Sequence, residues 1–134
     1  MNPYQKYKNQ SIESMSQLEL LLTLYDEAIK DLKRMDLALE DKDYDQFEDH
    51  MDYFTRIIRY LVRTLDMTQP VAKDLNRLYQ YILYDCGRIS AGRERRRSEI
   101  PALIDILTDL RDGFQQAGTK TNVERIAEEK RVVV

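Results

Sequence analysis

Cysteine, histidine, tryptophan and glycine are scarce in this chain of 134 residues, which has one Cys, one His, no Trp and four Gly. Cys86 has no second cysteine with which to form an internal disulfide, and we predict that it is a buried apolar residue in a reducing compartment. The one histidine, His50, cannot supply the paired Glu-x-x-His ligands of di-iron bundles, and we expect it at the surface or flanking the apolar seam. No glycine-rich phosphate loop occurs. We therefore predict no enzyme, no catalytic residue, no cofactor and no metal site.

A strong charge of one sign and a long apolar run are also missing. The formal net charge is −3, with 21 basic and 24 acidic residues, so the chain creates no strong field toward nucleic acid or an anionic membrane. No N-terminal stretch combines a basic start with an apolar run, and we predict neither an export signal nor a membrane span. A chain of this length can bury one contiguous core. We predict a single cytoplasmic domain.

Apolar residues recur at alternating steps of three and four in four segments, the spacing that places them on one face of a helix. Each segment carries residues that commonly start or stop helices. These signals are Ser16 with Glu19, Asp43 with Gln46, Pro70 with Gly92, and Ser98 with Gly118. Gly87 lies inside the third segment, where glycine costs roughly 1 kcal/mol relative to alanine. We therefore expect a neighbouring helix to approach closely at Gly87.

The four segments are matched in length, since about 20 residues make a helix of roughly 30 Å. A short connection forces adjacent helices to run antiparallel. We predict an all-α fold, an antiparallel up-down four-helix bundle over residues 16–117. Residues 1–15 and 118–134 are predicted to be mobile tails, the second with a short helix as an option.

Arg93–Arg97, preceded by Arg88, is the one dense basic cluster. Arginine pairs well with oxyanions, so the cluster is a candidate site for an anionic ligand or nucleic acid. The alternative is a solvated turn between the third and fourth helices, which the absence of interleaved aromatic residues favours.

Four short stretches resemble the flagellin-specific export chaperone family, FliS, and the resemblance extends over about residues 2–117. The N-terminal stretch has the asparagine, proline and spaced tyrosines of that family, and the others have its Leu-Tyr-Asp, Leu-Tyr-x-Tyr and final Leu-Arg patterns. They are Asn2-Pro3-Tyr4-Gln5-Lys6-Tyr7, Leu20-Leu21-Leu22-Thr23-Leu24-Tyr25-Asp26 with Ala28-Ile29, Leu75-Asn76-Arg77-Leu78-Tyr79-Gln80-Tyr81, and Leu107-Thr108-Asp109-Leu110-Arg111. The family's usual glycine after Leu-Tyr-Asp is Glu27 here, and Phe114 stands where a tryptophan is common.

The resemblance implies a cytoplasmic chaperone that binds the C-terminal segment of flagellin, prevents its premature polymerisation and delivers it to the flagellar type III export apparatus. A divergent paralogue that binds another secreted flagellar protein is the alternative. We expect the protein neither to bind nucleic acid nor to span a membrane. A homodimer is an option for the client-free protein. An amphipathic client would lay its apolar face into grooves between helices and fold as it binds.

Residues predicted to contact the partner lie beside or on the apolar seams, apart from Tyr7 in the N-terminal tail. They are Tyr7, Leu20, Leu24, Tyr25, Ile29, Ile57, Tyr60, Leu78, Tyr81 and Ile82. The alternative for each helical residue is that it packs the core. Tyr4 and Tyr7 are also candidates for a self-plug, an N-terminal tail that covers the groove until a client displaces it.

Overall fold

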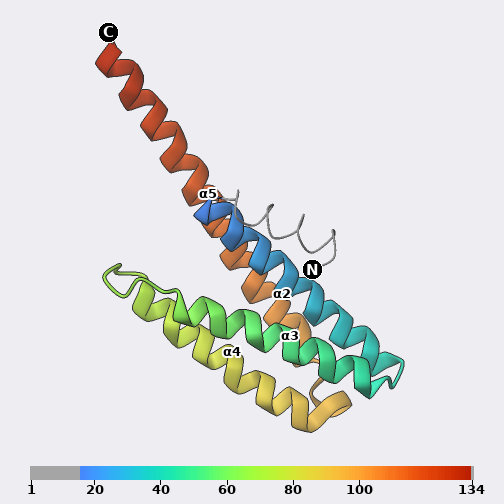
Figure 1. Ribbon diagram of the computed structural model, residues 1–134. Coiled ribbons are helices and arrows are strands. Elements are labelled where there is room, and N and C mark those ends of the chain that lie inside the picture. The colour runs from blue at the N-terminus through green and yellow to red at the C-terminus, as the bar shows by residue number, and fades with distance from the viewer. Residues whose placement is uncertain (1–15, 134) are drawn as a thin grey trace, which may run out of the picture.

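The structure is a computed structural model that describes the backbone of residues 16–133 and the side chains of residues 16–118. Within this part of the chain the fold is all-α, as predicted, with four α-helices, one short 3₁₀ helix and no strand. The elements are α2 (Gln17–Glu40), α3 (Tyr44–Arg63), α4 (Ala72–Gly92), η1 (Arg93–Arg96) and α5 (Glu99–Val133). Figure 1 shows α2 lying beside both α3 and α5.

The predicted N-terminal caps of the first two helices are confirmed. The backbone N–H of Glu19 donates to Oγ of Ser16 at 3.1 Å, and that of Gln46 donates to Oδ1 of Asp43 at 3.2 Å. Each bond satisfies one of the backbone donors that the first turn of a helix leaves unpaired. The third helix begins two residues after Pro70, at Ala72.

The helices contact one another as in a bundle. α2 packs against α3 and α5, α3 packs against α4, and α4 makes few contacts with α5. The residues of the four apolar seams meet between the helices. Their fully buried members include Tyr25, Leu32, Phe47, Phe54, Ile58, Ile82, Ile89, Ile100, Leu103 and Leu107. This single core holds α2 in the middle of the bundle. The surfaces of α2 that remain open are therefore on its polar flanks and in its N-terminal half.

The prediction that the last helix ends at Gly118 is wrong, because α5 continues to Val133 and projects beyond the other helices (Figure 1). One glycine costs a helix only about 1 kcal/mol and does not terminate it by itself. A Cβ placed on Gly118 would lie 2.1 Å from Cδ2 of Leu18. The absence of a side chain at residue 118 therefore lets α2 and α5 approach closely.

The expected close approach at Gly87 is also wrong. A Cβ placed on that residue would meet no atom within 4 Å, because the glycine lies on the exposed side of α4. The close contact that we expected in the third helix lies instead at Gly118 in the fourth.

His50 flanks the seam of α3 and does not stand at the surface, because its side chain is only 15% exposed. Its Nδ1 lies 3.1 Å from Oδ1 of Asp31, a buried residue of α2. Burial raises the pKa of the Asp31 carboxyl, and the hydrogen bond to His50 opposes that rise. The histidine thus supplies a partner to an acid that the α2–α3 interface would otherwise leave unpaired.

Candidate partner-binding groove

An open groove of about 350 Å³ lies between the N-terminal half of α2 and the C-terminal half of α3. Three of the predicted partner-binding residues, Leu20, Leu24 and Tyr60, line it together. Tyr60 is 38% exposed, so its ring is accessible at the α3 side of the groove. We call this hollow the α2–α3 groove. It offers the apolar side chains of two helices to a third chain segment.

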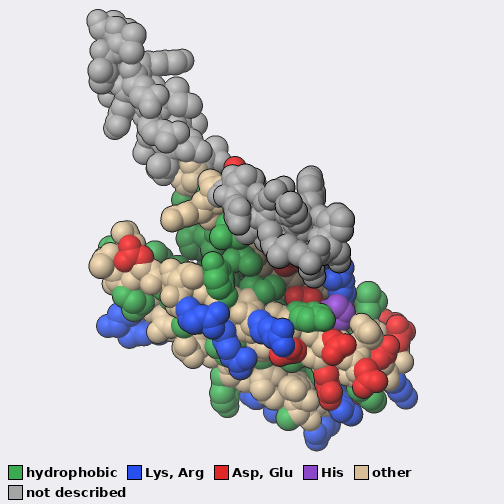
Figure 2. Space-filling model, in the orientation of Figure 1, with side chains coloured by type: hydrophobic (Ala, Val, Ile, Leu, Met, Phe, Trp, Pro, Cys, Tyr) green, Lys and Arg blue, Asp and Glu red, His purple; other side chains and the backbone are tan. Residues whose placement is uncertain are grey.

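A second hollow, of about 170 Å³, shares Leu21, Leu61 and Thr64 with the α2–α3 groove. It reaches Val71 in the connection between α3 and α4, and Phe114 of α5. Figure 2 shows hydrophobic side chains gathered between α3 and the helices above it, in the region where these hollows lie. The apolar surface therefore extends beyond two helices.

Sequence reasoning missed several lining residues, most of which belong to the core seam or to a connection. They are Gln17, Leu21, Leu61, Thr64, Leu65, Val71 and Phe114. Seam residues at a bundle end are only partly covered, and the sequence does not show how far the neighbouring helices cover them.

The other predicted partner-binding residues lie elsewhere. Tyr25 and Ile82 are fully buried, so their placement on a groove surface is wrong and they belong to the core. Ile29, Ile57 and Leu78 are half-buried against that core. Tyr81 is 52% exposed on α4 and does not line the α2–α3 groove. The self-plug residues Tyr4 and Tyr7 lie outside the described residues.

The Tyr25 hydroxyl forms a hydrogen bond with the hydroxyl of Tyr79 on α4, and both rings are buried. Burial raises the pKa of both phenols, so both are neutral at physiological pH. Phe114 of α5 stacks on Tyr25, with ring centroids 5.9 Å apart. Tyr25 thereby connects three helices just beneath the groove.

Asp26 forms a bidentate ion pair with Arg111 of α5, through Nε to Oδ1 and through Nη2 to Oδ2 at 3.3 Å. The Leu-Tyr-Asp stretch of α2 therefore performs three tasks. Leu24 lines the groove, Tyr25 bonds to the Leu-Tyr-x-Tyr stretch of α4, and Asp26 pairs with the Leu-Arg stretch of α5. Three stretches that resemble the family in sequence are thus in contact in space.

The arginines of the basic cluster pair mostly with acids of the same chain. Arg97 pairs with Asp36 at 2.8 Å, and Arg93 pairs with Glu48 at 3.5 Å. Arg93 also lies over the ring of Tyr44, 4.2 Å from its centroid. These contacts hold the turn after α4 against α2 and α3. Arg93 and Arg97 therefore have a structural role.

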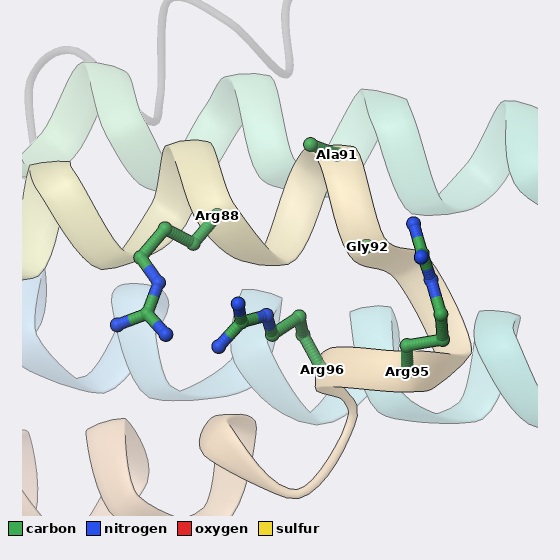
Figure 3. A pocket seen from close by; sticks show the side chains of 5 residues that line it. All are labelled: Arg88, Ala91, Gly92, Arg95 and Arg96. Carbon is green, nitrogen blue, oxygen red and sulfur yellow. The ribbon is translucent and has the colours of Figure 1, made fainter.

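A pocket of about 470 Å³ beside this turn is lined by Arg88, Arg95 and Arg96, with Ala91 and Gly92. Figure 3 shows Arg88 and Arg96 extending into one region, whereas Arg95 extends in another direction. Both converging guanidinium groups lie near Oε1 of Glu99, at 3.6 and 3.3 Å. The three arginines do not converge on a common point, so this geometry favours internal pairing over capture of an anion.

Among the described residues, no group of His, Cys, Asp or Glu is arranged to hold a metal ion, and no helix is long and apolar enough to cross a membrane. The buried position predicted for Cys86 is confirmed. A helical bundle with an open apolar groove has the geometry of proteins that bind an amphipathic segment of another protein.

Comparison with known proteins agrees with this class. The family model described as flagellar protein FliS matches residues 1–121, and the chain belongs to that family. The chain is also similar to the flagellar secretion chaperone FliS of Bacillus subtilis (strain 168), with 24% identity over 116 residues that cover 87% of this chain and 86% of that protein. FliS is a family of chaperones, not of enzymes.

Proposed function

We propose that this protein is a cytoplasmic flagellar export chaperone that binds the C-terminal segment of flagellin. In this role it prevents premature polymerisation of flagellin and delivers it to the type III export apparatus. The observation that carries the proposal is the open α2–α3 groove, lined by Leu20, Leu24 and Tyr60, in a member of the FliS family.

The physical basis is the burial of an apolar face. An amphipathic segment that is disordered when free can place its apolar side chains in a groove between helices and become helical there. Such coupled folding buries on the order of 1,000 to 3,000 Å² and loses several kcal/mol to ordering. The complex is therefore specific, yet it dissociates readily enough for export. An antiparallel up-down arrangement of the helices would bring the N-terminal half of α2 beside the C-terminal half of α3, where the groove lies.

The same groove supports dimerisation of the client-free protein, since an open apolar patch promotes association. A client would then compete with the second copy. Analytical ultracentrifugation with and without a client peptide tests this part of the proposal, and a monomer at all concentrations would contradict it.

Calorimetric titration with a peptide of roughly 40 residues from the C-terminus of flagellin of the same organism tests the main proposal. We expect one-to-one binding, a negative heat-capacity change and a gain in helicity by circular dichroism. Failure to bind, together with binding of another secreted flagellar protein, would identify a paralogue with a different client.

A pair of tyrosine variants locates the binding surface. Tyr60→Ala removes a ring from the α2–α3 groove, and Tyr84→Ala removes a ring that is 67% exposed on α4. We expect Tyr60→Ala to weaken binding about tenfold or more, because buried tyrosines often dominate an interface. We expect Tyr84→Ala to bind as the unaltered protein does. Equal binding by both variants would contradict the groove as the client site.

A further inference from the structure

Positive charge and exposed apolar side chains are concentrated in the same part of this acidic protein. Residues 53–84 contain five basic and two acidic residues, a formal charge of +3, whereas the whole chain carries −3. Six of the seven large hydrophobic side chains exposed in the described part of the chain lie in this range. They are Tyr53, Tyr60, Met67, Val71, Tyr81 and Tyr84.

One stripe of α3 combines the two features. Tyr53, Arg56, Tyr60 and Arg63 follow one another at steps of three, four and three, so they lie along one side of the helix. All four side chains are exposed, and Tyr60 also lines the α2–α3 groove. The stripe therefore meets the groove at Tyr60, and we call these four residues the rim. Figure 2 shows basic side chains over α3 next to the hydrophobic ones.

The two arginines of the rim differ in their partners. Arg56 pairs with Asp52 on its own helix at 2.7 Å, and both side chains are more than half exposed. Arg63 has no ion-pair partner among residues 16–118. Arg63 lies in the last turn of α3, where a cation interacts favourably with the helix dipole. That interaction does not account for Arg56, which lies two turns earlier, nor for the two tyrosines that alternate with the arginines.

We propose that this rim selects clients by charge. Its preferred occupant is an amphipathic helical segment whose apolar face enters the groove and whose acidic side chains pair with Arg63 and Arg56. The two arginines are seven residues apart, a rise of roughly 10.5 Å, so acidic residues seven positions apart on a client helix match them. This inference rests on the proposed function and names the chemistry of the flagellin segment that the groove accepts.

A matched pair of charge reversals tests the inference. Arg63→Glu and Arg95→Glu each change the charge by the same amount at an exposed arginine that forms no ion pair with the described residues, but Arg95 lies in η1, away from the groove. We measure binding of the C-terminal flagellin peptide at low and high salt. We expect Arg63→Glu to weaken binding about three- to tenfold at low salt, with the difference shrinking at high salt. Arg95→Glu should leave binding unchanged.

A charge-swapped peptide provides the decisive comparison. Replacing the peptide's acidic residues with lysine should weaken binding to the unaltered protein and restore binding to Arg63→Glu. Arg63→Gln, which removes the charge without placing an acid at the end of α3, provides a variant that retains the fold if Arg63→Glu does not. Circular dichroism establishes that each variant is folded.

The outcomes separate the two proposals. If the unaltered protein does not bind the peptide, the proposed function is wrong, and this inference falls with it. If the peptide binds equally well to the unaltered protein and to the Arg63 and Arg95 variants, the chaperone function stands and charge selection by the rim is wrong. A larger loss in Arg95→Glu than in Arg63→Glu would also overturn the inference.

Discussion

The hydrogen bond between the hydroxyls of Tyr25 and Tyr79 lends itself to a double-mutant cycle. Tyr25 is 0% exposed and Tyr79 is 2% exposed, and each hydroxyl has the other as its only partner among the described residues. Tyr79→Phe would leave the Tyr25 hydroxyl buried and unpaired, and Tyr25→Phe would do the same to Tyr79. A buried polar group without a partner costs about 1–3 kcal/mol. We expect each single variant to lose that amount of unfolding free energy.

The double variant should be less affected than the sum of the two single variants. Replacing both hydroxyls leaves two apolar rings in an apolar environment, and such paired replacements are often nearly neutral. For a nearly neutral double variant the coupling free energy equals the sum of the two single losses, about 2–6 kcal/mol. At roughly 4 °C in Tm per kcal/mol, each single variant should melt several degrees below the unaltered protein, and the double variant should melt several degrees above its additive expectation.

Urea unfolding followed by circular dichroism at constant protein concentration measures all four proteins. The slope of unfolding free energy against urea should stay the same, because the surface exposed on unfolding hardly changes. Additive losses with no coupling would refute the reasoning, as would single variants as stable as the unaltered protein. Either result would mean that water or another group satisfies the hydroxyls.

Three further predictions concern stability and reactivity. Gly87→Ala should raise the unfolding free energy by up to about 1 kcal/mol, because nothing lies within 4 Å of the new Cβ. Gly118→Ala should give no such gain, because Leu18 would have to move. Urea unfolding curves that show the reverse order of stability would contradict this prediction. Burial raises the pKa of the Cys86 thiol to about 12, so Ellman's reagent should react with it at pH 8 only as fast as the protein unfolds, and rapid reaction in the folded state would contradict its burial. Burial and the charge of Glu99 raise the pKa of the Asp85 carboxyl. Its ionisation therefore opposes folding at a pH above that raised pKa, and this destabilisation is absent at a pH below the unfolded value of 3.8. Asp85→Asn should therefore be more stable than the unaltered protein at pH 7, with a difference that disappears as the pH approaches 3; a difference that grows at low pH would refute the sign.

Local signals in the sequence were enough to find the helices. Ser16 and Asp43 cap α2 and α3 as predicted, because a capping side chain bonds to a backbone N–H only three residues away. The seams predicted the core for the same reason, since the helical period depends on the backbone alone. The prediction failed where the signal was ambiguous. Gly118 can end a helix or admit a close neighbour, and only the position of Leu18 shows that it does the latter.

The candidate groove could be predicted only in part. Leu20, Leu24 and Tyr25 stand within six residues of one another and are all large and apolar or aromatic, yet Tyr25 is in the core and the two leucines line the groove. Which side of α2 meets α3, and which meets α5, decides between these positions. Tyr60 and Tyr81 were both predicted to contact the partner, but only Tyr60 lines the α2–α3 groove.

The sequence by itself determined the four helices, the composition of their common core and, through short motifs, the resemblance to a family. Each of these depends on residues that are near one another along the chain or on the helical period. The tertiary structure decided the partners of charged and polar groups, such as Asp26 with Arg111 and Asp31 with His50. It also decided which seam residues remain open at one end of the bundle. Those properties depend on how far and at what angle separate helices approach, and that is fixed only when all the side chains of the core pack together.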